Sequence, residues 1–190
     1  MLYKYRGIKE FRFFVDIILN QRLYAAPYFD LNDPMEGQYL YNTGELNEDV
    51  NKLISGEKDK IRICSLSRDG NNELMWSHYA EGHRGIVVGV ETIPSSEQTL
   101  RPITYDGLVT INQHNLNPNS PIDILSHKLN VWEYEKEERV FIKNKFFVAV
   151  KVRELIYGRR MSNQDKSFIK SLVDKINPAI EIGSAENNYV

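Results

Sequence analysis

The 190-residue chain has a single cysteine, Cys64, and this scarcity excludes several kinds of site. One cysteine cannot form an intramolecular disulfide, and it cannot supply the several thiolates of a cysteine-based zinc site. Cys64 lies in the apolar-flanked run IRICSLS, where we expect a buried, inert thiol rather than a nucleophile.

Long hydrophobic runs and a strong net charge are also missing. The densest apolar run, FFVAV, is far shorter than the ~20 residues of a membrane-spanning helix. Charged residues also follow Met1 too soon for a secretory signal peptide. The formal net charge is −2, so no global basic field attracts nucleic acid or anionic lipid, although a transient nucleic-acid substrate stays compatible with the sequence. We expect a cytoplasmic protein with no membrane partner.

Motifs of familiar catalytic and cofactor sites are absent as well. The sequence has no GxGxxG, GxxxxGK[ST], GxSxG or HExxH. His78 and His83 are five positions apart, which places them on different faces of a helix and away from a shared metal. The side chains that could bind a hard cation are Asp33, Glu36, His78, Glu135 and Glu137. Their spacing does not demand a metal ion, and we expect none.

The remaining composition is that of an ordinary globular chain, with 42% hydrophobic and 26% charged residues. No repeat, linker or low-complexity tract divides it, so residues 1–190 are expected to form a single domain. Strand-like and helix-like segments are intermixed without regular alternation, which favours α+β over a doubly wound parallel sheet. We expect one compact domain with mixed or mostly antiparallel sheets flanked by helices.

Apolar periodicity places the expected elements along the chain. Strands are expected at LYKYR, RLYAAP, IRICSLSR, GIVVGVE, ITYDGLV, EERVFI, FFVAVKV and AIEIG. Helices are expected over residues 11–20, weakly over 44–60, over ELMWSHYAEGH and PIDILSHKLNVW, and after a capping box at Ser162–Asp165. FDLNDPME and NQHNLNPNSP are expected to be loops because Asn, Asp and Pro favour turns.

The stretch VWEYEKEERVF places four glutamates within six positions. As a strand, it would line one face with Glu133, Glu135, Glu137 and Arg139, whereas a helix would spread the carboxylates over its surface. A solvated charged face explains the stretch without any function. Half-burial of adjacent carboxylates would instead raise at least one pKa and suit proton transfer or stabilisation of a cation. The residues alone leave both interpretations open.

Two other segments contain polar and aromatic groups that are suited to a pocket. Asn32 and Asp33 precede Pro34, a pattern that turns favour for local reasons and that could also present free amides to an anion. In MWSHYA, Trp76 and Tyr79 could stack on a planar ring, but the segment alone favours a core position for Trp76.

Together these segments resemble one bacterial family. LYKYR, RLYAAPYFDLNDPME, CSLSR, LMWSHYAEGHRGIVVGV and HKLNVWEYEKEERVF occur in its order, over nearly the whole chain. The chain is identified as a member of the domain of unknown function twenty-nine-seventy-one family, whose name implies no activity. More distantly it resembles the ADP-ribosyltransferases, including DNA-modifying toxins of bacterial defence systems, and their opening strand–helix–strand matches residues 2–27.

This resemblance implies NAD as the substrate and assigns roles to particular residues. The catalytic residues would be Glu137, with Glu135 in an E-x-E pair, acting on an oxocarbenium-like transition state. The residues that bind NAD would be Tyr5 or Arg6 on the first strand, Ser65 and Ser67, and Trp76 and Tyr79 beside the nicotinamide. The residues that shape the pocket would be Asn32, Asp33, Glu36, His78 and Arg139, with Arg139 orienting Glu135.

Three hypotheses follow for the function. The first is an ADP-ribosyltransferase-like enzyme, such as a toxin or anti-phage effector, that modifies a nucleic acid or protein acceptor. The alternative is a non-catalytic nucleotide-binding or regulatory module, and metal-dependent hydrolysis ranks third. The first predicts that Arg6, Ser65, Trp76 and Glu137 converge on one cleft, with Glu137 on a strand.

Overall fold

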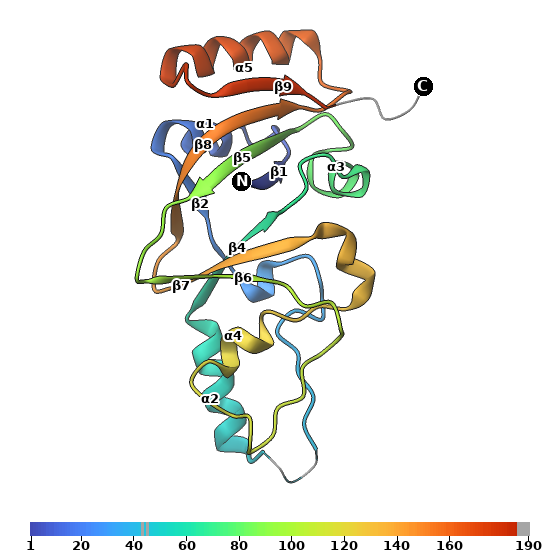
Figure 1. The fold of residues 1–190 in the computed structure, drawn as a ribbon, viewed down its shortest axis with the longest axis vertical. Coiled ribbons are helices and arrows are strands. Elements are labelled where there is room, and N and C mark those ends of the chain that lie inside the picture. The colour runs from blue at the N-terminus through green and yellow to red at the C-terminus, as the bar shows by residue number, and fades with distance from the viewer. Residues whose placement is uncertain (43, 45, 186–190) are drawn as a thin grey trace.

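A nine-stranded sheet organises the computed structural model, which describes residues 1–42, 44 and 46–185 (Figure 1). Its strands are β1 (Leu2–Arg6), β2 (Arg22–Tyr24), β3 (Ala26–Pro27), β4 (Ile61–Ser67), β5 (Ile86–Thr92), β6 (Gln98–Pro102), β7 (Glu137–Lys143), β8 (Phe147–Tyr157) and β9 (Glu181–Ser184). They follow the order β2-β8-β5-β1-β4-β7-β6, while β3 pairs with β4 and β9 with β8. The β8–β9 pair is parallel, and the other strand pairs are antiparallel.

The sheet opens between its two central strands, β1 and β4. β1 pairs with β5 along its whole length, from Leu2 to Arg6. Its register with β4 joins Tyr3 to Ser67, after which the two strands no longer run as a ladder. Polar side chains of both strands therefore face a shared space instead of a continuous sheet surface.

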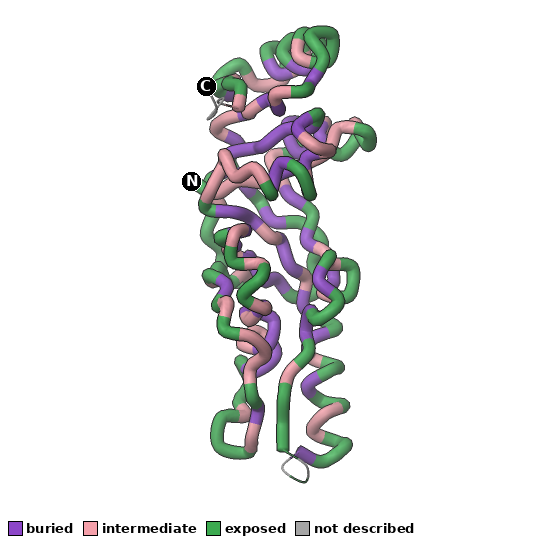
Figure 2. Tube along the Cα trace, turned by 90° about the vertical axis from the view of Figure 1, so that its right-hand side faces the viewer, coloured by how far each residue is buried: buried purple, intermediate pink, exposed green. Residues whose placement is uncertain are grey.

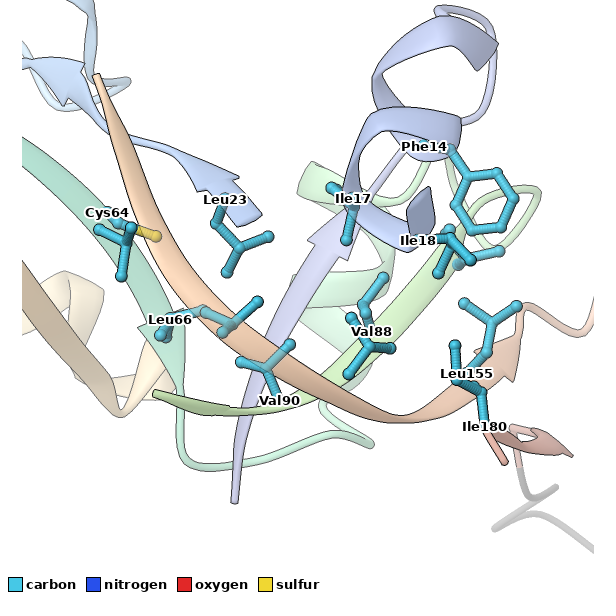
Figure 3. Packing of buried hydrophobic residues seen from close by; sticks show 14 of the residues in the cluster. Phe14, Ile17, Ile18, Leu23, Cys64, Leu66, Val88, Val90, Leu155 and Ile180 are labelled. Atoms are coloured by element: carbon cyan, nitrogen blue, oxygen red, sulfur yellow. The ribbon is translucent and has the colours of Figure 1, made fainter. Parts of the chain in front are cut away.

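Helices α1 (Phe11–Asn20) and α5 (Asn163–Ile176) pack on the main core of the sheet. Phe14 and Ile18 of α1 point toward Val88 of β5 and Leu155 of β8 (Figure 3). Removal of such side chains from water drives this packing. At the start of α5 the Ser162 hydroxyl accepts a hydrogen bond from the backbone N–H of Asp165, so Ser162 caps the helix as the sequence predicts.

The far end of the molecule has a separate small core beneath helices α2 (Glu48–Asp59) and α4 (Ser120–Ile124). Leu46, Ile54, Ile111 and Ile124 form it. Figure 2 shows more exposed residues around α2 than along the strands. With α3 (Glu73–Tyr79) and the 3-10 helices η1 (Tyr28–Asp30) and η2 (Asn130–Glu135), these elements confirm a single α+β domain with a mostly antiparallel sheet.

Two predicted elements are wrong. ITYDGLV is not a strand, because Thr104 forms an isolated bridge with His127 and the chain then turns at Gly107, whose φ is 101°. The strand in this region is β6, immediately before it, which the prediction missed. PIDILSHKLNVW is helical only in α4 and η2, because the intervening backbone of Lys128 bonds to Thr104 and Gly107.

The glutamate-rich stretch is neither a single strand nor a single helix. It begins in η2, which contains Glu133 and Glu135, and Lys136 then adopts a left-handed conformation with φ of 45°. Glu137 is the first residue of β7. Glu133 is exposed while Glu135 and Glu137 are buried, so the turn at Lys136 separates a solvated carboxylate from two enclosed ones.

Among the helices of residues 1–42, 44 and 46–185, none combines the length and the apolar character needed to cross a bilayer.

Candidate functional site

A pocket of about 270 Å³ occupies the opening between β1 and β4. Residues from β1, β4, α3, the loop after η1, and β7 border it. Most of the predicted site residues lie on its wall: Tyr5, Arg6, Asn32, Asp33, Ser65, Ser67, Tyr79, Glu135, Glu137 and Arg139. Side chains that are distant in the sequence therefore meet at one place, with Glu137 on a strand.

Glu137 and Arg139 form the base of one pocket wall. They alternate on the same face of β7, and the Arg139 guanidinium donates from Nε to Glu137 Oε1 at 2.7 Å and from Nη2 to Oε2 at 3.1 Å. The other edge of the guanidinium donates to both oxygens of Glu36 at 2.7 and 2.9 Å. Arg139 is 1% exposed, so two bidentate contacts compensate its buried charge.

Lys128 completes this wall and was not among the predicted site residues. Its ammonium donates to Glu135 Oε2 at 2.6 Å and to Glu137 Oε2 at 3.3 Å. It also lies 4.9 Å from the centre of the Trp132 ring. The sequence signal was weak, since Lys128 is seven and nine positions from the glutamates and no regular helix or strand brings them together. We call Glu36, Glu135, Glu137, Arg139 and Lys128 the carboxylate wall.

Two tyrosines make further hydrogen bonds with Glu135 and Glu137. The Tyr79 hydroxyl donates to Glu135 Oε1 at 2.5 Å. The backbone N–H of Glu137 donates to the Tyr105 hydroxyl at 2.7 Å. Glu135 and Glu137 are thus held from several directions, which limits the rotamers that either can adopt.

Burial and ion pairing oppose each other at Glu137. Burial raises the pKa of its carboxyl, but the positive charges of Arg139 and Lys128 and hydrogen bonds from Arg139 and Ser65 outweigh burial and lower the pKa well below its usual range. Glu137 is therefore a carboxylate at neutral pH, and it is not a group whose pKa is raised on balance. Burial does raise the pKa of Glu36, against the pull of Arg139.

Lys4 and Arg6 supply positive charge from the β1 side of the pocket, and we call them the cationic wall. They alternate on one face of β1. The Lys4 ammonium donates to the Ser65 carbonyl at 2.9 Å. The Arg6 guanidinium lies 5.1 Å from the centre of the Phe13 ring, and its buried Nε has no hydrogen-bond partner among the described residues. Burial also lowers the Arg6 pKa.

Tyr5 points to the other face of β1, where its hydroxyl is already bonded. It donates to the Asp69 carbonyl at 2.8 Å and accepts from the backbone N–H of Asn72 at 2.9 Å. Of the two first-strand candidates, Arg6 therefore has the polar groups left to meet a ligand, although both residues border the pocket.

The two serines of β4 have different surroundings. The Ser65 hydroxyl contributes a hydrogen bond that helps to lower the Glu137 pKa. Ser67 donates to the carbonyl of Glu135 at 2.7 Å and accepts from the N–H of Asp69 at 3.0 Å. Ser67 thus ties β4 to η2, while Ser65 acts directly on the carboxylate wall.

Three predicted residues do not border the pocket. Trp76 is fully buried, stacks on His83 and meets Tyr5 edge-on at 5.4 Å. Met75 and Tyr79 share the pocket-facing side of α3, and Trp76 lies one position away, turned toward the core. Its predicted contact with nicotinamide is therefore wrong, and the core interpretation is right.

His78 and Glu36 are also placed differently from the prediction. His78 is exposed, with Nδ1 3.0 Å from the Tyr134 hydroxyl. Glu36 lies behind the pocket surface as a partner of Arg139. Arg139 itself was expected to orient Glu135, but the carboxylates that it bonds are those of Glu137 and Glu36, and Lys128 holds Glu135 instead.

Asn32 and Asp33 reach the pocket from the loop after η1. Asp33 accepts the backbone N–H of Met35 at 2.9 Å, a local turn contact of the kind that the sequence favoured. The Asn32 side chain lowers the pKa of the Tyr79 hydroxyl, which donates to Glu135. The loop therefore supports the carboxylate wall through Tyr79.

In the part of the chain that the structure describes, no group of three or more His, Cys, Asp or Glu side chains is arranged to hold a metal ion. No family model, curated protein or solved structure matches the chain. The family membership and the likeness to ADP-ribosyltransferases therefore stay predictions from the motifs.

Proposed function

We propose that the protein is an NAD-dependent ADP-ribosyltransferase-like enzyme. The observation that supports this function is the meeting of two charged groups at one pocket, with Lys4 and Arg6 coming from β1 and Glu135 and Glu137 from η2 and β7. A ligand with an anionic and a cationic part fits such a pocket better than a ligand of one sign. NAD has both parts, a diphosphate and a positively charged nicotinamide ring.

The cationic wall would bind the diphosphate. Arg6 borders the pocket, and a guanidinium is well suited to phosphate oxygens because its N–H groups form a planar fork. Its partial burial strengthens such a contact by reducing competition from water.

The carboxylate wall would stabilise the reacting sugar. When the bond between ribose C1′ and the nicotinamide nitrogen breaks, its electron pair leaves with nicotinamide and positive charge develops on the ribose. Glu137 holds a negative charge in a fixed direction at neutral pH, which favours this transition state without reorganisation. The acceptor then forms the new bond to C1′, and its proton passes to a carboxylate of the pair or to water.

The chain order also supports this proposal. β1, α1 and β2 follow one another as strand, helix and strand, and Glu137 of the E-x-E pair is the first residue of β7. The acceptor is proposed to be a nucleic acid or protein that binds transiently. Tyr24 borders the pocket, is half exposed and contacts Phe147, which offers a planar surface to such an acceptor.

One observation favours the alternative, a nucleotide-binding module without turnover. Both glutamates are occupied by Lys128 and Arg139, so they could serve only to shape the pocket. The two functions differ in whether the nicotinamide bond is broken.

Label transfer separates the two functions. The full chain is incubated with NAD labelled in its ADP-ribose part, together with mixed nucleic acid and cell lysate, and label in macromolecules is counted. We expect transfer by the wild type and by Glu133→Gln, which changes an exposed carboxylate of the same stretch. Glu137→Gln should reduce transfer by about 100-fold or more. Equal transfer by wild type and Glu137→Gln would overturn the enzymatic function of this residue.

A further inference from the structure

Lys128 is the group that joins the two glutamates of the site to each other. Its ammonium contacts Glu135 at 2.6 Å and Glu137 at 3.3 Å, and all three residues are at most 6% exposed. A single cation from outside the E-x-E pair therefore links both carboxylates, and its contact with Glu135 is the shorter of the two.

The backbone of Lys128 is fixed independently of the glutamates. Its N–H donates to the Thr104 carbonyl at 3.0 Å, and its carbonyl accepts from the N–H of Gly107 at 3.1 Å. The ammonium also lies near the Trp132 ring. The loop after β6 therefore fixes the backbone from which the ammonium reaches the two glutamates.

The charges around Lys128 show what its removal would do. Three carboxylates of the carboxylate wall, Glu36, Glu135 and Glu137, face two cations, Lys128 and Arg139. Arg139 already bonds both oxygens of Glu36 and of Glu137. Glu135 is bonded by the Tyr79 hydroxyl and Lys128, so without the lysine no cation in the wall would contact it.

We infer that Lys128 is a positioning residue, which holds Glu135 and Glu137 side by side in the orientation in which Glu137 meets the ligand. This inference rests on the proposed function, because the orientation matters to a reacting ribose. Lys128 acts through the glutamates and has no bond to make or break in the transfer itself. The positive charge on Lys128 also contributes to keeping the Glu137 pKa low.

The first experiment compares Lys128→Met and Lys128→Arg with wild type in nicotinamide release from NAD across pH. For Lys128→Met, kcat should fall about 10- to 100-fold because the carboxylate is misplaced, with KM changed little. Its activity should also decline on the acid side at a pH higher by about one unit or more, because Glu137 has lost a positive neighbour. Lys128→Arg should keep the wild-type pH profile and recover most of kcat.

Lys170→Met is the matched control, since the Lys170 ammonium pairs with Asp174 at 2.7 Å on the exposed side of α5, and it should behave as wild type. If Lys128→Met does not fold, Lys128→Met combined with Glu135→Gln removes the cation together with its nearest carboxylate. This double variant should fold, and its activity should still decline at a higher pH than that of wild type on the acid side. If the activity of the folded Lys128 variant declined on the acid side at the same pH as that of wild type, the inference would be overturned.

A second measurement needs no substrate and separates this inference from the proposed function. Because the Glu137 pKa is lowered on folding, the stability that it contributes is present at neutral pH and is lost as pH falls through the lowered pKa. The stability gap between wild type and Lys128→Met should therefore narrow as pH falls below about 5. A constant gap overturns the role of Lys128, whereas a narrowing gap without any NAD turnover overturns only the proposed enzyme.

Discussion

The two charged walls of the pocket differ in how completely their charges are compensated within the chain. In the carboxylate wall, Glu137 and Arg139 bond one another and further partners, and both are almost fully enclosed. In the cationic wall, Lys4 bonds one carbonyl and the Arg6 Nε has no partner among the described residues. The carboxylate wall is therefore organised before any ligand arrives, whereas the cationic wall has fewer hydrogen bonds within the described residues.

The difference indicates two distinct tasks. A group that must stabilise charge during a reaction benefits from a fixed direction, since reorganisation during the reaction would cost free energy. A group that must capture a ligand benefits from an unfilled donor, since the ligand then gains a bond that the free protein lacks. Substitutions on the two walls should accordingly separate loss of folding from loss of binding.

The largest effect on stability is expected from Arg139→Met. It leaves Glu36 and Glu137 buried without their main cation, which should lower the free energy of unfolding by about 3–5 kcal/mol in urea denaturation. Arg153→Met removes an exposed ion pair with Glu91 and should cost at most about 1 kcal/mol. Similar losses in the two variants would show that the carboxylate wall is not the organised element described above.

A smaller effect, on binding rather than stability, is expected from Arg6→Met. The free energy of unfolding should stay equal or rise, because a buried donor without a partner is removed. The Kd for NAD, measured by calorimetric titration, should rise about tenfold or more, which corresponds to about 1.4 kcal/mol. Arg12→Met, at an exposed side chain that also contacts Phe13, serves as the control. If Arg6→Met lost stability and its affinity for NAD stayed unchanged, the cationic wall would serve folding rather than binding.

The smallest effect on function is expected from Tyr79→Phe. It removes one hydrogen bond to Glu135 and leaves the bond from Lys128, so stability should fall by about 1–2 kcal/mol and kcat by less than about tenfold. Thermal unfolding and steady-state nicotinamide release would measure the two changes. A loss as large as that of Arg139→Met would mean that Tyr79, rather than the ion pairs, organises the wall.

Local patterns in the sequence were sufficient for much of the fold. β5 and β7 follow from apolar runs, and Glu137 and Arg139 share a face because strand side chains alternate. The place of Tyr79 on the pocket side of α3 agrees with its helical spacing from Met75. These features depend on neighbours within a few positions.

The remaining features depend on contacts between distant segments. Lys128 reaches Glu135 only because the Thr104–His127 bridge holds its backbone and Lys136 turns the chain. ITYDGLV has the composition of a strand, but its backbone bonds go to that bridge and to a turn at Gly107. The hydrophobic periodicity of a single segment does not predict contacts of this kind between distant segments.

Nicotinamide release from NAD by the purified full chain, with and without Glu137→Gln, tests the central claim most directly. The account predicts steady release by wild type and a rate lower by about 100-fold or more in the variant, with folding retained as judged by its thermal unfolding. Equal rates in the two proteins, or no release from wild type while NAD still binds in titration, would contradict the proposed enzyme.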